Sequence, residues 1–139
     1  MGKEISLECG DTYKGDLVDG KKEGKGKLKF KSGNVYKGEF HNDKMEGKGV
    51  FKFANGNKYD GEWKDGNMNG KGTFTTKDGS KYVGDFVDGN FHGSGVLKVK
   101  GQPTYEGEFK EGKKNGKGVL INSDGSREDG VWENDKKVS

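Results

Sequence analysis

The sequence repeats itself every 23 residues, and this period limits the fold more than any other feature. Glycine follows two positions after each member of a tyrosine series, and 25 of the 27 glycines share the same frame. A fixed period of about 20–50 residues indicates stacked supersecondary units, each packed against its neighbours. The tyrosines are Tyr13, Tyr36, Tyr59, Tyr82 and Tyr105, and Glu128 takes the sixth place.

Residue types within each unit alternate in a way that predicts β-strands. Glycines and large side chains alternate with polar ones, as in Tyr36-x-Gly38-x-Phe40, and a period of two is typical of half-buried strands. We therefore expect an all-β fold, an elongated single-layer antiparallel meander of about twelve strands. One domain is expected over residues 1–139, with a half repeat at 1–12, repeats at 13–35, 36–58, 59–81, 82–104 and 105–127, and a terminal half repeat at 128–139.

The strand register can be predicted if the residues between Phe40 and Gly49 form a loop. The predicted pairs are then Phe40 with Gly49, Gly38 with Phe51, and Tyr36 with Phe53. A type I turn with a left-handed bulge at Gly56 would follow, pairing Phe53 with Tyr59, Phe51 with Gly61, and Gly49 with Trp63. Large residues would face glycines, so that rings cover bare backbone and the sheet curls into a groove.

An acidic residue recurs on the opposite face of each unit. We interpret this row as solvated, with weak ion pairs, and a cation-binding strip is the alternative. The row is Asp16, Glu39, Glu62, Asp85 and Glu108, with Lys27 expected between the first two.

Composition and charge exclude several classes of protein. Only 27% of residues are hydrophobic, which favours disorder, but 11% are aromatic and the net charge is only +3, which favours a folded chain. All basic residues except Arg127 are lysines, so base-specific nucleic-acid binding is not expected. The sequence has no membrane-spanning run, no secretory signal and one cysteine, Cys9, so we expect a cytoplasmic protein that is not secreted.

No arrangement of residues predicts catalysis. His41 and His92 lie far apart in the sequence without a second ligand at metal-binding spacing, and no phosphate-binding loop motif occurs. We therefore expect a protein that is not an enzyme, with no catalytic residues, no metal and no cofactor.

The repeat unit resembles the MORN (membrane occupation and recognition nexus) repeat. The clearest copy is Tyr59-Asp-Gly61-Glu-Trp63-Lys-Asp-Gly66-Asn-Met-Asn-Gly70-Lys-Gly72-Thr-Phe74. Departures are Asp43, Gln102 and Asp135 at glycine positions and Glu128 at the tyrosine position. The resemblance implies a scaffold or adaptor, because related repeats occur in ciliary, cytoskeletal and membrane-junction proteins and in phosphoinositide kinases.

The apolar face predicts a groove that binds a protein partner, either an amphipathic helix or an extended segment. A second copy could instead associate through the terminal strands. Phe30 and Phe53 give way to Thr76, Val99 and Asn122 along the chain, so stronger binding is expected in the N-terminal half. The predicted groove residues are Tyr13, Tyr36, Phe40, Phe53, Tyr59, Trp63, Tyr82, Phe86, Tyr105 and Phe109.

A membrane-binding module is the alternative function. A lysine-rich segment would attract an anionic leaflet, and the N-terminal sequence fits a short acylation pattern with Gly2 and Cys9 as candidate sites. The segment's lysines are Lys21, Lys22, Lys25, Lys27, Lys29 and Lys31. Cytoskeletal, ciliary and membrane-peripheral locations all remain open.

Overall fold

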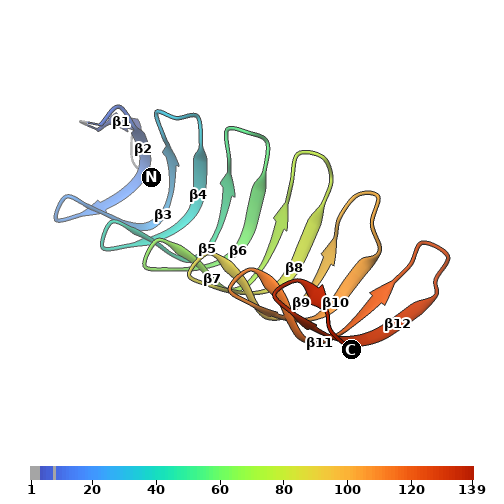
Figure 1. Cartoon of the computed structure of the whole chain (residues 1–139). Helices are drawn as coiled ribbons and strands as arrows, with labels where there is room; N and C mark the ends of the chain where they lie inside the picture. The colour runs from blue at the N-terminus through green and yellow to red at the C-terminus, as the bar shows by residue number, and fades with distance from the viewer. Residues whose placement is uncertain (1–3, 8) are drawn as a thin grey trace.

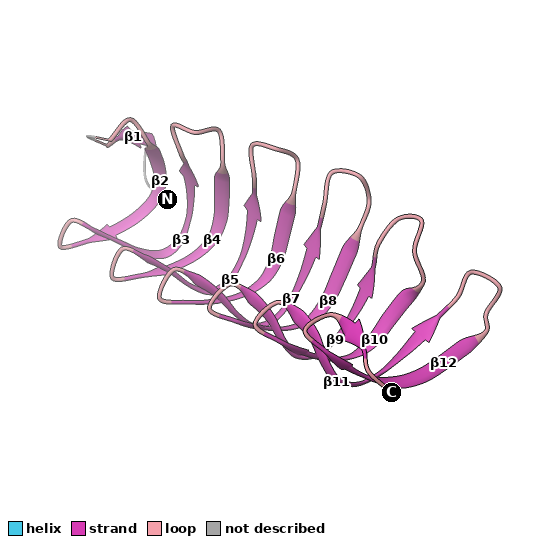
Figure 2. Ribbon diagram, in the orientation of Figure 1, coloured by secondary structure: helices cyan, strands magenta, loops and turns pink. Residues whose placement is uncertain are grey.

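The chain folds into one antiparallel sheet whose thirteen strands follow chain order, as seen in a computed structural model that describes residues 4–7 and 9–139 (Figures 1 and 2). The predicted all-β meander is confirmed, with a three-residue strand at one end and a two-residue strand at the other. The strands are β1 (Glu4–Ser6), β2 (Thr12–Val18), β3 (Lys21–Lys29), β4 (Val35–His41), β5 (Lys44–Lys52), β6 (Lys58–Lys64), β7 (Asn67–Thr75), β8 (Lys81–Val87), β9 (Asn90–Lys98), β10 (Thr104–Lys110), β11 (Lys113–Ile121), β12 (Arg127–Glu133) and β13 (Lys136–Lys137).

The hairpins stand side by side, with β1 and β12 at opposite ends of the row (Figure 1). Each strand bends along its length, so the two sets of turns stand on either side of a concave surface. We call this surface the inner face, because the tyrosines pack on it, and the opposite surface the outer face.

Two-residue turns form one edge of the sheet. Both central residues have positive φ, for example 49° at Asn42 and 71° at Asp43, as in the type I′ turns that match strand twist. The eight-residue loop expected between Phe40 and Gly49 is therefore wrong, because β4 continues to His41 and β5 begins at Lys44. The turn residues are Asp19-Gly20, Asn42-Asp43, Asp65-Gly66, Asp88-Gly89, Glu111-Gly112 and Asn134-Asp135.

Three-residue turns form the other edge. Gly56 has a φ of 99°, and its N–H donates to the Phe53 carbonyl at 3.0 Å, so the predicted left-handed bulge at Gly56 is confirmed. The turn between β9 and β10, where Gln102 takes a glycine position, has a different shape. There the positive φ, 81°, lies at Gly101, and the Gln102 N–H donates to the Val99 carbonyl.

The predicted register is wrong by two residues at most positions and by four beyond the bulge in the β4–β5 hairpin. In that hairpin glycine opposes glycine and large side chains oppose one another, because the short turn leaves no room for the expected loop. The observed pairs in the first central hairpin are Tyr36 with Phe51, Gly38 with Gly49, and Phe40 with Met45. The next pairs are Phe51 with Tyr59, Gly49 with Gly61, and Gly47 with Trp63. Shifts of two and of four residues both preserve the face of each side chain, so the predicted apolar face is retained.

Candidate binding groove

Each tyrosine ring lies over a pair of glycines on the inner face. A Cβ atom added to Gly49 would lie 2.5 Å from Cε1 of Tyr36, so no larger residue fits there. The Tyr36 hydroxyl donates to the Glu39 carbonyl at 2.8 Å, and the other four tyrosines repeat this bond to the residue three positions on. The ring is therefore fixed both by packing and by a hydrogen bond, and the glycine frame serves this packing.

Most of the predicted groove residues lie beneath the accessible surface. Nine of the ten are at most 7% exposed, and only Phe53 is half-buried. The rings contact one another edge to face, with centroids 5.3 Å apart for Tyr36 and Trp63 and 4.9 Å apart for Tyr59 and Phe86. We call these nine side chains the floor of the groove: Tyr13, Tyr36, Phe40, Tyr59, Trp63, Tyr82, Phe86, Tyr105 and Phe109.

Half-buried apolar side chains border this floor, and we call them the rims. One rim, next to the two-residue turns, holds Met45, Met68 and Phe91, which pair with Phe40, Trp63 and Phe86. The other, next to the three-residue turns, includes Phe30 and Phe53. The sequence prediction missed the first rim because it placed those residues in loops. The short turns beside them, such as Asp65-Gly66, were the available signal.

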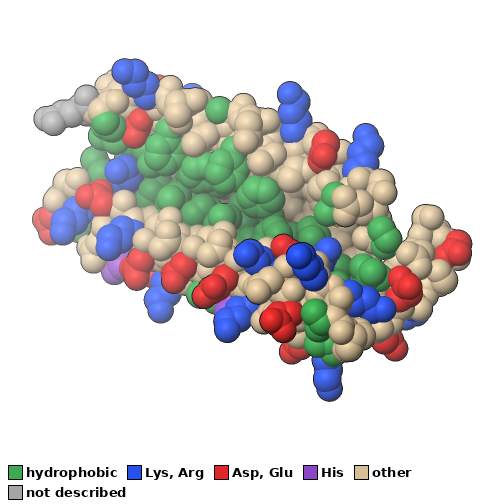
Figure 3. All heavy atoms as spheres, in the orientation of Figure 1, with side chains coloured by type: hydrophobic (Ala, Val, Ile, Leu, Met, Phe, Trp, Pro, Cys, Tyr) green, Lys and Arg blue, Asp and Glu red, His purple; other side chains and the backbone are tan. Residues whose placement is uncertain are grey.

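Hydrophobic side chains gather on the concave side of the molecule (Figure 3). This apolar surface spreads over the N-terminal repeats and gives way to polar atoms toward the C-terminus. The distribution follows the sequence of the second rim, in which aromatic residues are replaced by Thr76, Val99 and Asn122.

Lysines replace the rim side chain at two places, and each has an acidic partner in the following turn. The Lys22 N–H donates to Asp43 at 2.7 Å, and the Lys114 N–H donates to Asp135 at 2.8 Å. The Lys22 Nζ atom also lies 3.7 Å from Asp43 and 5.7 Å from the centroid of the Tyr13 ring. Asp43 and Asp135, two of the three departures from the glycine pattern, therefore accompany these lysines.

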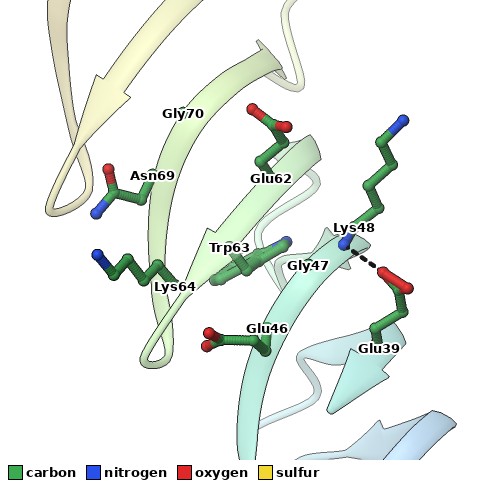
Figure 4. Close-up of a pocket in the computed structure, with 9 residues that line it drawn as sticks. All are labelled: Glu39, Glu46, Gly47, Lys48, Glu62, Trp63, Lys64, Asn69 and Gly70. Carbon is green, nitrogen blue, oxygen red and sulfur yellow. Dashed lines mark hydrogen bonds between the residues drawn. The ribbon is translucent and has the colours of Figure 1, made fainter. Parts of the chain in front are cut away.

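The acidic row on the outer face has a structural function that the sequence did not reveal. Between Gly38 and Phe40, β5 runs two residues longer than β4 and forms a bulge. The Lys48 N–H in this bulge donates to Glu39 at 2.8 Å, and the dashed line in Figure 4 marks this bond. Glu62, Asp85 and Glu108 repeat it with the backbone N–H groups of Lys71, Ser94 and Lys117. These four carboxylates therefore stabilise the bulges.

Two electrostatic effects distinguish the outer and inner faces. Hydrogen bonding and attraction from Lys71, which forms an ion pair with Asp85, lower the pKa of that carboxyl group. On the inner face, burial raises the pKa of Tyr59 and Tyr82 to about 12 and that of Tyr36 further still.

The lysines predicted to contact lipid do not form one patch. Lys22 faces inward, Lys25 opposes Glu39, and Lys31 lies in a turn. Lys27 does not lie between Asp16 and Glu39, because the true register places it between Lys14 and Lys37. Lys29 lies on β3, 3.6 Å from Glu4, and Lys21 pairs with Val18 at the end of the strand.

The two histidines of the described residues, 4–7 and 9–139, lie on different strands, β4 and β9. His41 is exposed and bonds to Glu23 at 2.8 Å, and His92 is half-buried on β9. No group of three His, Cys, Asp or Glu side chains in these residues could hold a metal ion. Cys9 is exposed, and Gly2 lies outside the described residues. No described helix could cross a membrane.

The fold is that of a β-meander repeat protein. The sequence profile of the MORN repeat matches residues 13–35, 36–58, 59–81, 82–98 and 105–127. The chain therefore belongs to the MORN repeat family.

The chain also has distant structural similarity to solved proteins. No curated protein gives a significant sequence match. Among solved structures, the chain is similar to the SAS-4 (dCPAP) TCP domain in complex with a proline-rich motif of Ana2 (dSTIL) of Drosophila melanogaster. The identity is 12%, the TM-score is 0.43, and the match covers 93% of this chain and 83% of that chain.

Proposed function

We propose that this protein is a non-catalytic interaction scaffold that binds an amphipathic helix or an extended segment of a partner in its groove. The observation that carries the proposal is the pair of half-buried apolar rims, which no described element covers. A one-layer sheet that leaves such side chains open presents a surface suited to an apolar partner. The setting we propose is a cytoplasmic assembly of cytoskeletal or ciliary type, in keeping with the family.

The rims, rather than the floor, supply the first contacts in this proposal. The floor side chains are too deeply buried to meet a partner without movement of their neighbours, so their role is to hold the rims apart and in place. Phe53 is the predicted groove residue that belongs to a rim, because its side chain is half-buried. A partner is expected to insert apolar side chains between Phe53 and Met68.

A pull-down from native lysate with matched variants tests this function. Phe53→Ser and Met68→Ser change the groove, and Val83→Ser changes the outer face, where Val83 is 44% exposed. Proteins lost with both groove variants but retained with the outer-face variant would support the scaffold. A set of bound proteins that is the same for all three variants would contradict it, provided that each variant keeps the wild-type circular dichroism spectrum.

Binding to an anionic membrane is the second candidate, and one observation favours it. Lys14, Lys27 and Lys37 are direct neighbours on three adjacent strands of the outer face. Like charges in this arrangement are destabilising, and an anionic surface would relieve the repulsion. Sedimentation with phosphatidylserine vesicles at low salt, with Lys27→Ser as the test and Lys64→Ser as the control, separates this function from groove binding.

Acylation at Gly2 or Cys9 would strengthen a membrane role. The intact mass of the protein isolated from its native source tests this directly. A mass that equals the unmodified sequence would remove acylation from the proposal.

A further inference from the structure

A row of lysines crosses the middle of the sheet on the outer face, next to the three-residue turns. Seven neighbouring strands, from β3 to β9, contribute five lysines, one valine and one threonine to this row, and no acidic residue. Each position adjoins a large inner-face residue in the sequence, as Lys58 adjoins Tyr59, so alternation along the strands places the row on the outer face. We call this set the lysine row, and in strand order its members are Lys29, Val35, Lys52, Lys58, Thr75, Lys81 and Lys98.

Positive charges in the lysine row lie directly opposite one another. Lys52 pairs with Lys58, Lys81 pairs with Lys98, and all four residues are exposed. Like charges in opposed positions destabilise a sheet. Among residues 4–7 and 9–139, these four lysines form no ion pair, and only the first lysine of the row has an acidic partner, Glu4 at 3.6 Å. The row is therefore a line of positive charge that the described part of the chain does not neutralise.

A second set of lysines on the outer face is paired with acidic residues. Lys48 opposes Glu62, and Lys71 opposes Asp85, with which it forms an ion pair. Both sets of lysines are exposed and cross the same part of the sheet, so exposure to solvent alone does not account for the difference between them. The charge of the lysine row, which has a single sign, is complementary to an anionic ligand.

Acidic residues in the three-residue turns are hydrogen-bonded to backbone groups. Asp11 accepts from the Lys31 N–H at 2.8 Å, and Asp78 accepts from the backbone N–H two residues later at 3.1 Å. The side chains of Lys31, Lys77 and Lys100 belong to exposed residues of these turns. The positive charge of the lysine row therefore continues to this edge of the sheet.

We propose that the lysine row binds an extended acidic segment of a partner protein, in which glutamate or aspartate alternates with small polar residues. Neighbouring strands lie about 4.8 Å apart, so the row is about 29 Å long. An extended segment places side chains on one face about every 6.8 Å, so five alternating carboxylates span about 27 Å. The two lengths match, and flexible lysine side chains can meet each carboxylate. The row and the groove lie on opposite faces, so this site goes beyond the proposed function.

The width of the lysine row favours a peptide over a larger anionic partner. On β6, Lys58 is followed on the same face by Asp60 and Glu62, and Asp85 lies on the same face of β8. A membrane or a nucleic-acid duplex that lay on this part of the outer face would meet these carboxylates. Single-stranded nucleic acid is bound by aromatic side chains on which bases stack, and the row contains none. A single extended segment needs only the row itself.

Fluorescence anisotropy of a labelled synthetic peptide tests the proposal. The peptide consists of five Ser-Glu repeats and is titrated with the protein at low salt, because salt screens exposed charges. One control peptide has glutamine in place of every glutamate, and a second, the block peptide, has five serines followed by five glutamates and so carries the same charge over about half the length. The alternating peptide should bind at least about fivefold more tightly than the block peptide, and the glutamine peptide should not bind.

Two matched variants locate the binding site on the protein. Lys58→Gln together with Lys81→Gln removes two charges from the lysine row, and Lys48→Gln together with Lys71→Gln removes two charges from the same face outside the row. The affinity for the alternating peptide should fall about tenfold in the first variant and less than about threefold in the second. All four lysines are exposed, so both variants should keep the wild-type circular dichroism spectrum.

The proposal would be overturned if the alternating peptide did not bind, if it bound no better than the block peptide, or if the two variants lost equal affinity. The last two results would show attraction by net charge alone. A ten-nucleotide oligouridylate, or phosphatidylserine vesicles, that bound more tightly than the alternating peptide and lost binding in the lysine-row variant would make a nucleic acid or a membrane the occupant instead. Phe53→Ser should leave peptide binding unchanged, so failure of this inference is distinguishable from failure of the groove function.

Discussion

The floor and the rims of the groove lie on the same face of the same strands, but they differ in burial. Tyr36 and Tyr59 are 0% exposed and fixed over glycines, whereas Phe53 and Met68 are only half-buried where they pack against the core cluster. The floor takes the place of a second layer in the interior of the protein, and in the proposed function the rims contact a partner.

Removal of a floor ring should have the largest effect on stability. Tyr59→Ala leaves a cavity against Trp63 and Phe86 and should lower the free energy of unfolding by about 3–5 kcal/mol. Tyr59→Phe removes only the hydrogen bond to the Glu62 carbonyl and should cost about 1 kcal/mol. Guanidinium unfolding measures both values. Equal costs for the two variants would mean that the ring is not part of the core.

Alkaline pH should have the next largest effect on stability, through the buried tyrosines of the floor. The pKa of Tyr59 and Tyr82 rises from 10.0 to about 12 on folding, so the folded state holds these protons more tightly than the unfolded chain. Stability is therefore unaffected below pH 10 and falls between pH 10 and 12. Each of these tyrosines contributes a loss of about 1.4 kcal/mol per pH unit in that range.

The melting temperature measured from pH 8 to pH 11.5 tests this dependence. Tyr82→Phe is the control, because it removes one titrating group while the ring remains. Its stability should decline less steeply with pH than that of the wild type. A wild-type melting temperature that stays constant to pH 11.5 would show that the floor rings are accessible to solvent.

Replacing a glycine beneath a floor ring with alanine should also lower the stability of the protein. Gly49→Ala directs a Cβ atom into the ring of Tyr36 and should cost about 1–3 kcal/mol. Val50→Ala, at the next position on the opposite face, is the control and should cost less because Val50 is only half-buried. Thermal unfolding followed by circular dichroism compares the two. The order would be reversed if the rings could shift freely over the glycines.

The sequence alone predicted the fold class, the repeat frame and the burial face, because a period of two within a period of 23 depends only on local patterning. It did not predict the register, because the register depends on the turn between His41 and Lys44 and on a bulge at Gly47. The extent of tyrosine burial depends on how far the strands bend. The glycine pattern indicates a bend but does not give its size. Met45 and Met68 were not predicted as groove residues, because the predicted loops included them in place of the two-residue turns beside them.

The hydrogen bonds between carboxylates and the bulges should contribute less to the free energy of unfolding than the floor rings do. Glu62→Ala removes the acceptor of the Lys71 N–H and should lower stability by about 1 kcal/mol. Asp60→Ala, on the same strand and exposed, should have little effect. Amide exchange at Lys71 should increase in the first variant only. Unchanged exchange there would mean that water replaces the carboxylate without loss.

The sharpest test of the comparison is expected at the rims, where the effect on stability should be well below that at the floor. Phe53→Ala removes a half-buried ring and should lower the free energy of unfolding by about 1–2 kcal/mol, well below the cost at Tyr59. Because aromatic residues at accessible positions concentrate interface energy, the same variant should reduce the retained amount of any groove-bound protein by about tenfold.

Val99→Ala, at the equivalent place two repeats on, should reduce it less, because the C-terminal part of this rim is less apolar. Quantitative mass spectrometry of the captured proteins, together with unfolding of each variant, measures both effects. Equal loss of binding for Phe53→Ala and Val99→Ala would remove the difference between the two halves of the groove, and full retention with both would assign the rims, like the floor, to the core alone.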